Sequence, residues 1–284
     1  IVNETHRRGM IVPGRKYRDK DAEPMSAAGA YVATPQKGIH DWIGSIDINS
    51  LYPSVIRALN MGPETIIGQI RPIITSAELN RAKHAKKSFA ASWDGQFGSW
   101  EYQAVMNQEK GTEVVVDWED ETSVRMSAAQ LYELVFDGNN KWMLSANGTI
   151  FTYEFEAIIP GLLKRWYEER QEMQRKMREC GDNEIEREYW DKRQLVKKIN
   201  LNSLYGAILN PGCRFFDMRI GQSVTLTGRC ITKHMASKVN EIVAGKYDHL
   251  GESVVYGDTD SVYFSAYKVL EKEIKEGLIP WTKD

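Results

Sequence analysis

Three aspartates stand where apolar, strand-like runs end. Asp47 closes the run WIGSID, while Asp258 and Asp260 flank one threonine in a short turn between two further apolar runs. Carboxylates in such places are either exposed or bound to metal, and Mg²⁺ favours a few carboxylates together with substrate phosphates. Asp is also a favoured turn residue, so a plain turn explains the Asp-Thr-Asp spacing equally well. Spacing alone leaves both interpretations open.

Longer strings around these acids are more specific than the acids themselves. They read DINSLYPS at residues 47–54, KINLNSLYG at residues 198–206 and YGDTDS at residues 256–261. In this order they resemble motifs A, B and C of family B DNA polymerases, in particular those of T-even-type bacteriophages. The strings GPET at residues 62–65 and SANG at residues 145–148 are similar to the same phage enzymes. Three strings in the family's order greatly reduce the false-positive risk of one short motif.

The resemblance implies DNA-directed DNA synthesis, in which a primer 3′-hydroxyl attacks a dNTP and pyrophosphate leaves. Asp47 and Asp260 match the carboxylates that hold two Mg²⁺ ions, and the backbone carbonyl of Ile48 matches a further metal ligand. Asp258 matches a supporting acid, and Lys198 a catalytic cation. Such ions activate the hydroxyl and neutralise the leaving group. The implied cofactor is therefore Mg²⁺, two ions, and the implied partners are primer–template DNA and dNTP.

A second group of residues matches the family's nucleotide site. Its members are Ser50, Leu51, Tyr52, Arg170, Lys198, Asn202, Tyr205 and Gly206. The resemblance implies that the amides of Ser50 and Leu51 cradle the triphosphate at a helix N-terminus. It further implies that Arg170 and Lys198 grip the triphosphate, that Tyr52 excludes a 2′-hydroxyl, and that the last three residues lie under the nascent base pair. By residue type alone, the cations are ordinary solvated charges and the tyrosines ordinary core aromatics.

One position departs from the family's pattern. A second fingers cation commonly follows one turn after the arginine, and Gln174 stands there, with Arg175 next to it. Gln carries no charge, and on an ideal helix Arg175 points about 100° away from that position. The sequence leaves open whether Arg175 compensates.

The pattern of apolar residues predicts the elements that position these groups. Runs at residues 30–33 and 42–48 predict two strands joined by a turn, and a helix follows the second run. Helical spacing over residues 161–180 and 184–205 predicts an antiparallel hairpin. A helix over residues 223–244 precedes the two strands around the Asp-Thr-Asp turn. Residues 71–150 show a weaker pattern, in which we expect a helix at 76–87 and a strand at 111–118. We assign no chemistry to this segment.

The expected fold class is α+β: a palm, an antiparallel sheet backed by helices, with an inserted helical-hairpin fingers element. We expect a first palm part at residues 1–160, including a variable insertion at 71–150. The fingers hairpin would occupy residues 161–206, and the second palm part residues 207–284.

Composition limits the class of protein but does not indicate a function. The net charge of −2 shows no basic excess, so any DNA contact must come from local clusters. No apolar stretch reaches membrane-span length, and no signal peptide is recognisable, so we expect no membrane association. The expected location is the cytoplasm, which for a phage-encoded protein is that of the bacterial host. Three well-separated cysteines predict neither a disulfide framework nor a zinc site.

Two further expectations concern the completeness of the chain and the alternative interpretations of its function. No exonuclease string and no thumb segment are recognisable, which predicts a fragment or split half with a companion polypeptide or missing segments; a sliding clamp is a further candidate partner. The rival interpretations are a reverse-transcriptase-like palm and a non-catalytic DNA-binding subunit derived from a polymerase. The motif strings at residues 47–54 and 198–206 disfavour the first, and the intact Asp47 and Asp260 disfavour the second.

Overall fold

The computed structural model describes residues 1–14, 29–72 and 98–279. The chain folds into two compact units. The first comprises Ile1–Ala28 and Tyr52–Leu226, and the second comprises Gly29–Leu51 and Thr227–Asp284. Helices and antiparallel sheets occur in both, so the predicted α+β class is confirmed. None of the helices in the described ranges is both long and apolar enough to cross a membrane.

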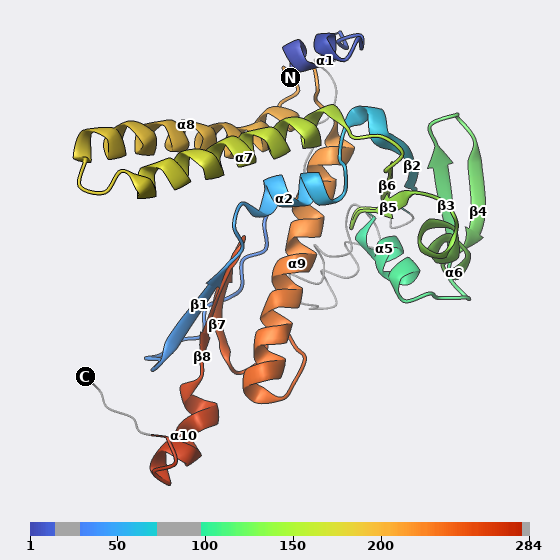
Figure 1. Cartoon of the computed structure of the whole chain (residues 1–284). Coiled ribbons are helices and arrows are strands. Elements are labelled where there is room, and N and C mark those ends of the chain that lie inside the picture. Colours follow the sequence, from blue (N-terminus) through green and yellow to red (C-terminus); the bar gives the residue numbers. More distant parts are fainter. Residues whose placement is uncertain (15–28, 73–97, 280–284) are drawn as a thin grey trace. The chain divides into compact units, whose positions relative to one another are not determined.

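The second unit is built on a three-stranded antiparallel sheet. Its order is β1 (Ile43–Asp47), β8 (Ser261–Ser265), β7 (Val254–Asp258). The latter part of α9 (Met218–Ala244) lies along this sheet in Figure 1, and α10 (Tyr267–Lys275) follows β8. Apolar residues of α9 and of the sheet form one small core: Ala236, Val239, Val254 and Val262. That core packs the sheet against α9.

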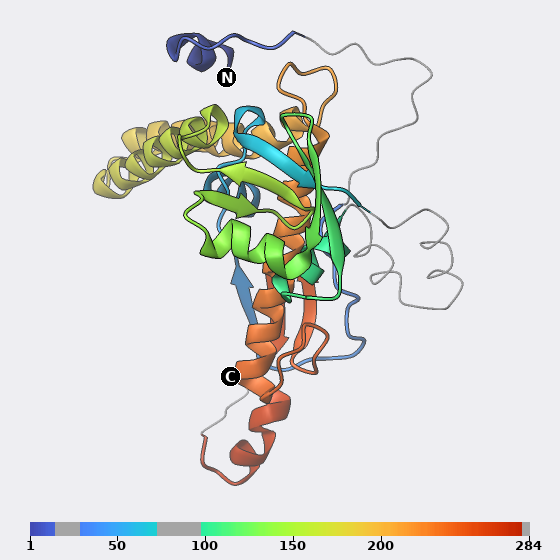
Figure 2. The ribbon, with the colours of Figure 1, turned by 90° about the vertical axis from the view of Figure 1, so that its right-hand side faces the viewer.

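A five-stranded antiparallel sheet forms much of the first unit. Its strands, side by side in Figure 2, follow the order β4 (Ser123–Ser127), β3 (Glu113–Trp118), β2 (Ile66–Ile70), β6 (Thr149–Thr152), β5 (Trp142–Leu144). Short helical elements complete it: η1 (Pro63–Thr65), α5 (Ser99–Met106), α6 (Ala128–Tyr132) and the π-helix η2 (Glu133–Asp137). Buried residues of α5, α6 and η2 pack with those of the sheet in one hydrophobic core.

Long helices make up the rest of the first unit. In Figures 1 and 2, α7 (Ile158–Glu179) and α8 (Glu184–Ile208) run side by side as an antiparallel hairpin. The short turn between them includes Gly181 at φ +53°, a left-handed conformation that glycine adopts without steric strain. Two other helices are α1 (Val2–Arg7) and α2 (Leu51–Ala58).

Most predicted elements are present, and one predicted strand is absent. The helical hairpin, the helix after Asp47, the strand within residues 111–118 and the strands around the Asp-Thr-Asp turn are confirmed. The run at residues 30–33 does not form a strand beside β1: Val32 makes an isolated bridge to Asp258, and β1 pairs with β8. Long-range pairing overrode a short local pattern there. The helix expected at residues 76–87 lies outside the described residues.

Candidate active site

The three predicted acids meet at one end of the three-stranded sheet. Asp47 is the last residue of β1 and lies opposite Ser261, which in turn lies opposite Asp258, the last residue of β7. The N–H of Ile48 donates to the carbonyl oxygen of Asp260 at 2.8 Å. Backbone hydrogen bonds therefore bring together carboxylates that lie far apart in the sequence.

The turn between Asp258 and Asp260 has a constrained backbone. Thr259 adopts φ +55°, and a β-branched residue is rare in this left-handed region. Its N–H donates to the carbonyl of Tyr31 at 2.9 Å, and its side-chain hydroxyl donates to Asp258 Oδ1 at 2.8 Å. The N–H of Asp260 donates to the Asp258 carbonyl at 2.6 Å. A conformation of this kind persists only where its surroundings over-determine it.

Helix α9 supplies a clamp for this turn that sequence reasoning missed. The hydroxyl of Thr232, a buried residue, donates to the Thr259 carbonyl at 2.5 Å, a shorter contact than the 3.1 Å to the Gly228 carbonyl of its own helix. Arg229, one turn earlier, donates to the Ala30 carbonyl at 3.1 Å beside Tyr31. A threonine inside a long amphipathic helix gives no sequence signal for such a role.

The carboxylates at this end of the sheet influence one another. Partial burial raises the pKa of Asp260, and the neighbouring carboxylates of Asp47 and Asp258 raise it further. The hydroxyl of Tyr256 donates to Asp258 Oδ2 at 3.3 Å. Mutual repulsion of this kind is what a bound cation relieves.

The donor set suits a hard divalent cation. Mg²⁺ is held by one or two carboxylates plus substrate phosphates, rather than by an all-protein cage. The described part of the chain contains no cluster of three His, Cys, Asp or Glu side chains able to hold a metal ion. Exposed Asp47 and partly exposed Asp260 could supply the carboxylates, and the Ile48 carbonyl a further oxygen.

The predicted nucleotide-site residues of the first unit lie on three helices. The rings of Tyr52 on α2 and Tyr205 on α8 pack with centroids 4.7 Å apart. Burial, and then the neighbouring Tyr52, raises the pKa of Tyr205. The side chains of Lys198 and Asn202 are exposed, and Gly206 is exposed as well. Ser50 and Leu51 belong to the other unit, where Ser50 at φ +53° precedes α2.

The cations of the hairpin are engaged to different degrees. Arg170 Nε donates to Gln194 Oε1 at 3.2 Å across the hairpin. Arg175 is held on both sides, with Nη2 2.6 Å from Glu172 Oε1 and Nη1 2.8 Å from Glu179 Oε1. These carboxylates, Glu172 foremost, raise the pKa of Arg175. The charge beside Gln174 is thus already neutralised locally.

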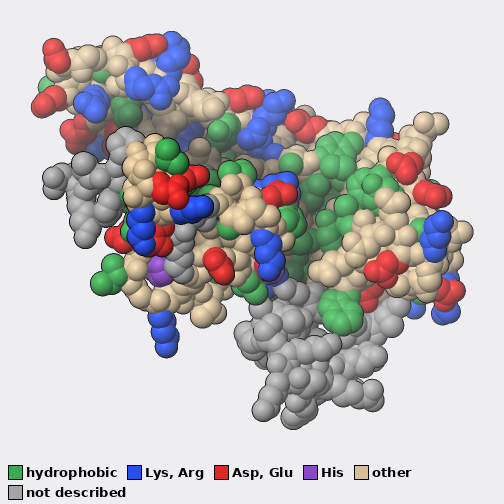
Figure 3. All heavy atoms as spheres, turned by 90° about the horizontal axis from the view of Figure 1, so that it is seen from below, with side chains coloured by type: hydrophobic (Ala, Val, Ile, Leu, Met, Phe, Trp, Pro, Cys, Tyr) green, Lys and Arg blue, Asp and Glu red, His purple; other side chains and the backbone are tan. Residues whose placement is uncertain are grey.

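Charges of both signs cover the hairpin. Figure 3 shows Lys and Arg interspersed with Asp and Glu over its far end, at the upper left. Lys192 contacts Glu188 at 2.6 Å, and Lys197 pairs with Glu169 across the two helices. Exposed pairs of this kind contribute little stability, so most hairpin charges form an ordinary solvated surface.

Comparison with known proteins assigns the chain to a family. The family described as DNA polymerase family B matches residues 1–276. The chain is a member of DNA polymerase family B. Relatives named DNA-directed DNA polymerase occur in Escherichia phage RB69, 26% identical over 277 residues, and Enterobacteria phage T4, 28% identical over 281 residues. Both alignments cover 96% of this chain and 30% of the relative, so the chain spans about a third of the length of these relatives.

A solved structure supports the fold. The family B DNA polymerase from the archaeon Pyrobaculum calidifontis matches with a TM-score of 0.54 and 19% identity, over 96% of this chain and 27% of that one. At this identity the likeness establishes the fold alone. It agrees with the α+β architecture expected of a family B palm region.

Proposed function

We propose that this chain carries the nucleotidyl-transfer region of a DNA-directed DNA polymerase. Residues 1–160 and 207–284 would form the two palm parts, and residues 161–206 the fingers hairpin. The observation that carries the proposal is the convergence of Asp47 and Asp260 at one end of the three-stranded sheet, fixed by the hydrogen bond from the Ile48 N–H to the Asp260 carbonyl. Membership of DNA polymerase family B and relatives named as DNA polymerases support it.

The acids at this end of the sheet would bind two Mg²⁺ ions. Asp47 and Asp260 are the proposed carboxylate ligands, the Ile48 carbonyl is a further ligand, and Asp258 supports the turn. When bound, the ions would lower the pKa of the primer 3′-hydroxyl and neutralise the leaving pyrophosphate. The protein's own contribution is to hold the two carboxylates in fixed positions, which the backbone pairing of β1, β7 and β8 supports.

Helix termini and helix surfaces would bind the rest of the nucleotide. The first amides of a helix have no intrahelical acceptor, so the N–H groups of Ser50 and Leu51 at the start of α2 are proposed to bind the triphosphate. Arg170 and Lys198 would add charge, since cations paired with phosphate form strong hydrogen bonds. Tyr52 is proposed as the group that excludes a 2′-hydroxyl, packed against Tyr205.

The proposal is tested by two isosteric substitutions. Asp47→Asn and Asp260→Asn, each in the full-length protein, should lower primer extension about a thousandfold, because several kcal/mol of transition-state stabilisation would be lost. Asp41→Asn, which changes an exposed aspartate of the same unit, should leave extension unchanged. More than a tenth of wild-type extension in either variant would contradict the metal assignment, whereas no extension by the wild type itself would favour a non-catalytic DNA-binding subunit.

Stability supplies a control for these variants. Because the folded pKa of Asp260 is raised, the folded state binds more protons than the unfolded state as pH rises through the ordinary range of Asp, and wild-type stability falls there. Asp260→Asn removes that penalty. Without added metal at pH 7, it should unfold at a slightly higher temperature than the wild type, since solvent screens a partly exposed carboxylate. This difference in unfolding temperature should disappear at a pH below the ordinary pKa of Asp. A variant that is less stable than the wild type by the same amount at pH 7 and at that low pH would indicate misfolding.

A further inference from the structure

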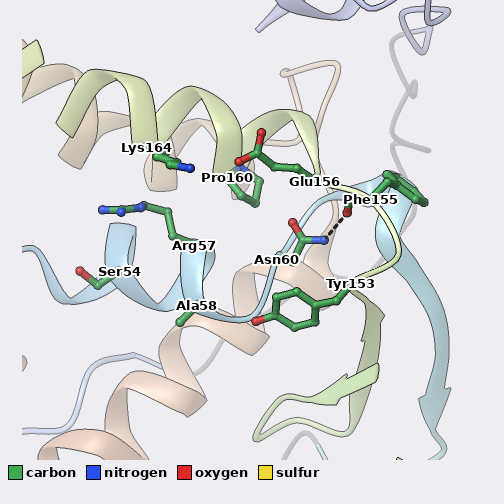
Figure 4. A pocket seen from close by; sticks show the side chains of 9 residues that line it. All are labelled: Ser54, Arg57, Ala58, Asn60, Tyr153, Phe155, Glu156, Pro160 and Lys164. Atoms are coloured by element: carbon green, nitrogen blue, oxygen red, sulfur yellow. Dashed lines mark hydrogen bonds between the residues drawn. The ribbon is translucent and has the colours of Figure 1, made fainter. Parts of the chain in front are cut away.

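The first unit contains an open cleft that the proposed chemistry does not use. Its volume is about 550 Å³, within the range of small-ligand sites. Figure 4 shows it between α2, the segment that follows β6, and the first turns of α7. The lining residues of interest are Arg57 of α2, Tyr153 and Glu156 of the connecting segment, and Lys164 of α7. None of them is among the predicted nucleotide-site residues.

The floor of this cleft is held by a buried asparagine. Asn60, only 4% exposed, donates from Nδ2 to the carbonyls of Thr152 and Phe155, both at 2.8 Å. Its Oδ1 accepts the N–H of Ala157 at 2.9 Å. All polar atoms of this side chain are thus engaged in fixing the segment between β6 and α7 next to the end of α2. The cleft is preformed rather than a gap between loose segments.

Two cations give the cleft a positive charge. Figure 4 shows Arg57 and Lys164 in the space between α2 and α7. Within the described ranges neither side chain forms an ion pair; the Arg57 guanidinium lies 5.0 Å from the ring centroid of Tyr167. The acidic residue of the lining, Glu156, is already paired, since Arg8 Nη2 lies 3.6 Å from its Oε2 and Arg8 Nη1 donates to its carbonyl. In the part of the chain that the structure describes, no ion pair therefore neutralises the positive charge of Arg57 and Lys164.

An aromatic side chain supplies an apolar wall. Tyr153 is 38% exposed, and partial burial raises the pKa of its hydroxyl. The exposed part of a phenol ring offers a stacking surface for a nucleobase, and such stacking tolerates any base. Cations and an exposed aromatic ring in one cleft are the combination that binds single nucleotides and single strands.

We propose that this cleft binds a nucleotide unit, with its phosphate on Arg57 and Lys164 and its base against Tyr153. A guanidinium offers phosphate a bidentate fork and an ammonium adds a point charge, so the pair suits phosphate better than either cation alone. The same chemistry has two sources, a free mononucleotide and a phosphodiester unit of a single strand. The proposal is independent of the acid site, because none of its residues is a proposed metal ligand.

Nucleotide-binding measurements in the presence of EDTA test the proposal, because EDTA removes the metal ions and with them any metal-dependent binding at the acid site. The probes are fluorescent ADP and a labelled oligo-dT, titrated against the full-length protein at several salt concentrations. The double variant Arg57→Gln with Lys164→Gln should weaken binding of the oligonucleotide at least tenfold and lower its salt slope by about 1.4, as expected for two lost phosphate contacts. Tyr153→Ala should weaken binding severalfold, whereas Tyr153→Phe should not.

Controls separate this site from general charge and from the acid site. Lys192→Gln removes one positive charge from an exposed pair on α8 and should change affinity little. Asp47→Asn and Asp260→Asn should bind both probes as the wild type does, even if extension is lost. A loss for the oligonucleotide alone identifies a single-strand site, and a loss for both probes identifies a mononucleotide site. If the double variant binds the probes as tightly as Lys192→Gln does, the proposal is overturned. If the double variant does not fold, the single variant Lys164→Gln, at an exposed position, replaces it in the same measurement.

Discussion

The acid site in the second unit and the helical hairpin in the first unit place charged groups by different means. In the acid site, main-chain hydrogen bonds place the acids: Asp47 ends a paired strand, and the Asp260 carbonyl accepts the Ile48 N–H. On the hairpin, long side chains on helix surfaces carry the charges, and neighbours compete for them. Arg175, for example, is held by Glu172 and Glu179.

This difference determines how each region should respond to substitution. Where the backbone fixes a charged group, removing that group abolishes its function, because no neighbouring side chain is positioned to replace it. A charge on an exposed helix can be exchanged, screened or redirected at an energetic cost of about 1 kcal/mol or less. We therefore expect the largest effects where a carboxylate at the sheet end is removed, smaller effects where rings pack between helices or a side chain supports the turn, and the smallest effects at hairpin charges.

The ring pair on α2 and α8 provides the largest remaining prediction. If Tyr52 lies under the sugar of an incoming nucleotide, a 2′-hydroxyl must clash with its ring or displace the sugar, and small displacements of reacting atoms can change the rate about a hundredfold. Tyr52→Ala should therefore lower discrimination against ribonucleotides by about that factor. The measurement is the ratio of kcat/KM for dCTP over CTP opposite template G.

The Phe variant and the unfolding temperature separate this gate from simple packing. Tyr52→Phe retains the ring and should retain discrimination. If Tyr52 only packs on Tyr205, Tyr52→Ala instead leaves a cavity, lowers stability by about 3 kcal/mol and slows dCTP and CTP use alike. An unaltered ratio in a folded Tyr52→Ala protein would exclude the gate.

The clamp on the Asp-Thr-Asp turn gives a prediction of intermediate size. Thr232→Val keeps the shape of the side chain and removes the hydroxyl that donates to the Thr259 carbonyl. The left-handed Thr259 would then be less firmly held, so extension should fall about tenfold and Mn²⁺ should bind more weakly. Mn²⁺ binding is followed by electron paramagnetic resonance, independently of turnover.

Two variants show whether the hydroxyl acts through the turn. Thr232→Ser keeps the donor and should restore both extension and Mn²⁺ affinity. Ser237→Ala removes a buried hydroxyl of the same helix that donates within the helix, to the Lys233 carbonyl at 2.9 Å. It should reduce stability slightly and leave Mn²⁺ affinity unchanged. Equal loss of Mn²⁺ affinity in Thr232→Val and Ser237→Ala would reduce the clamp to a contribution to helix packing.

The sequence predicts the strand ends and the helices because their signals are local. Asp47 closes a β-branched run, and Gly181 interrupts two helical patterns, so β1 and the hairpin follow from residue type and spacing. The motif strings then identify the acids that meet in the second unit. Local patterns failed at residues 30–33, where the partner strand is distant in the sequence.

Contacts between segments far apart in the sequence could not be predicted. The hydrogen bond from Thr232 to Thr259, the position of Asn60 under the segment after β6, and the pairing of Arg175 with Glu172 each depend on tertiary geometry or side-chain orientation. A buried hydroxyl or amide has the same letter in the sequence whether it caps a helix, fixes a turn or fills space. The open question about Gln174 is of this kind.

The smallest expected effect concerns that position. Because Arg175 is held by Glu172 and Glu179, it should not supply the charge that Gln174 lacks, and Arg175→Ala should leave the KM for dNTP unchanged. Gln174→Lys adds a charge on the partly buried side of α7 and should lower that KM two- to tenfold, about 1 kcal/mol for a partly screened charge. Gln174→Met, which alters polarity without adding charge, is the matched control and should resemble the wild type. The salt dependence decides the cause, since a gain due to charge declines between about 0.05 and 0.5 M salt as the Debye length shortens, whereas a packing effect does not. If Arg175→Ala instead raises the KM as strongly as Arg170→Ala, Arg175 exchanges its glutamates for the triphosphate, and the hairpin is as specifically built as the sheet end.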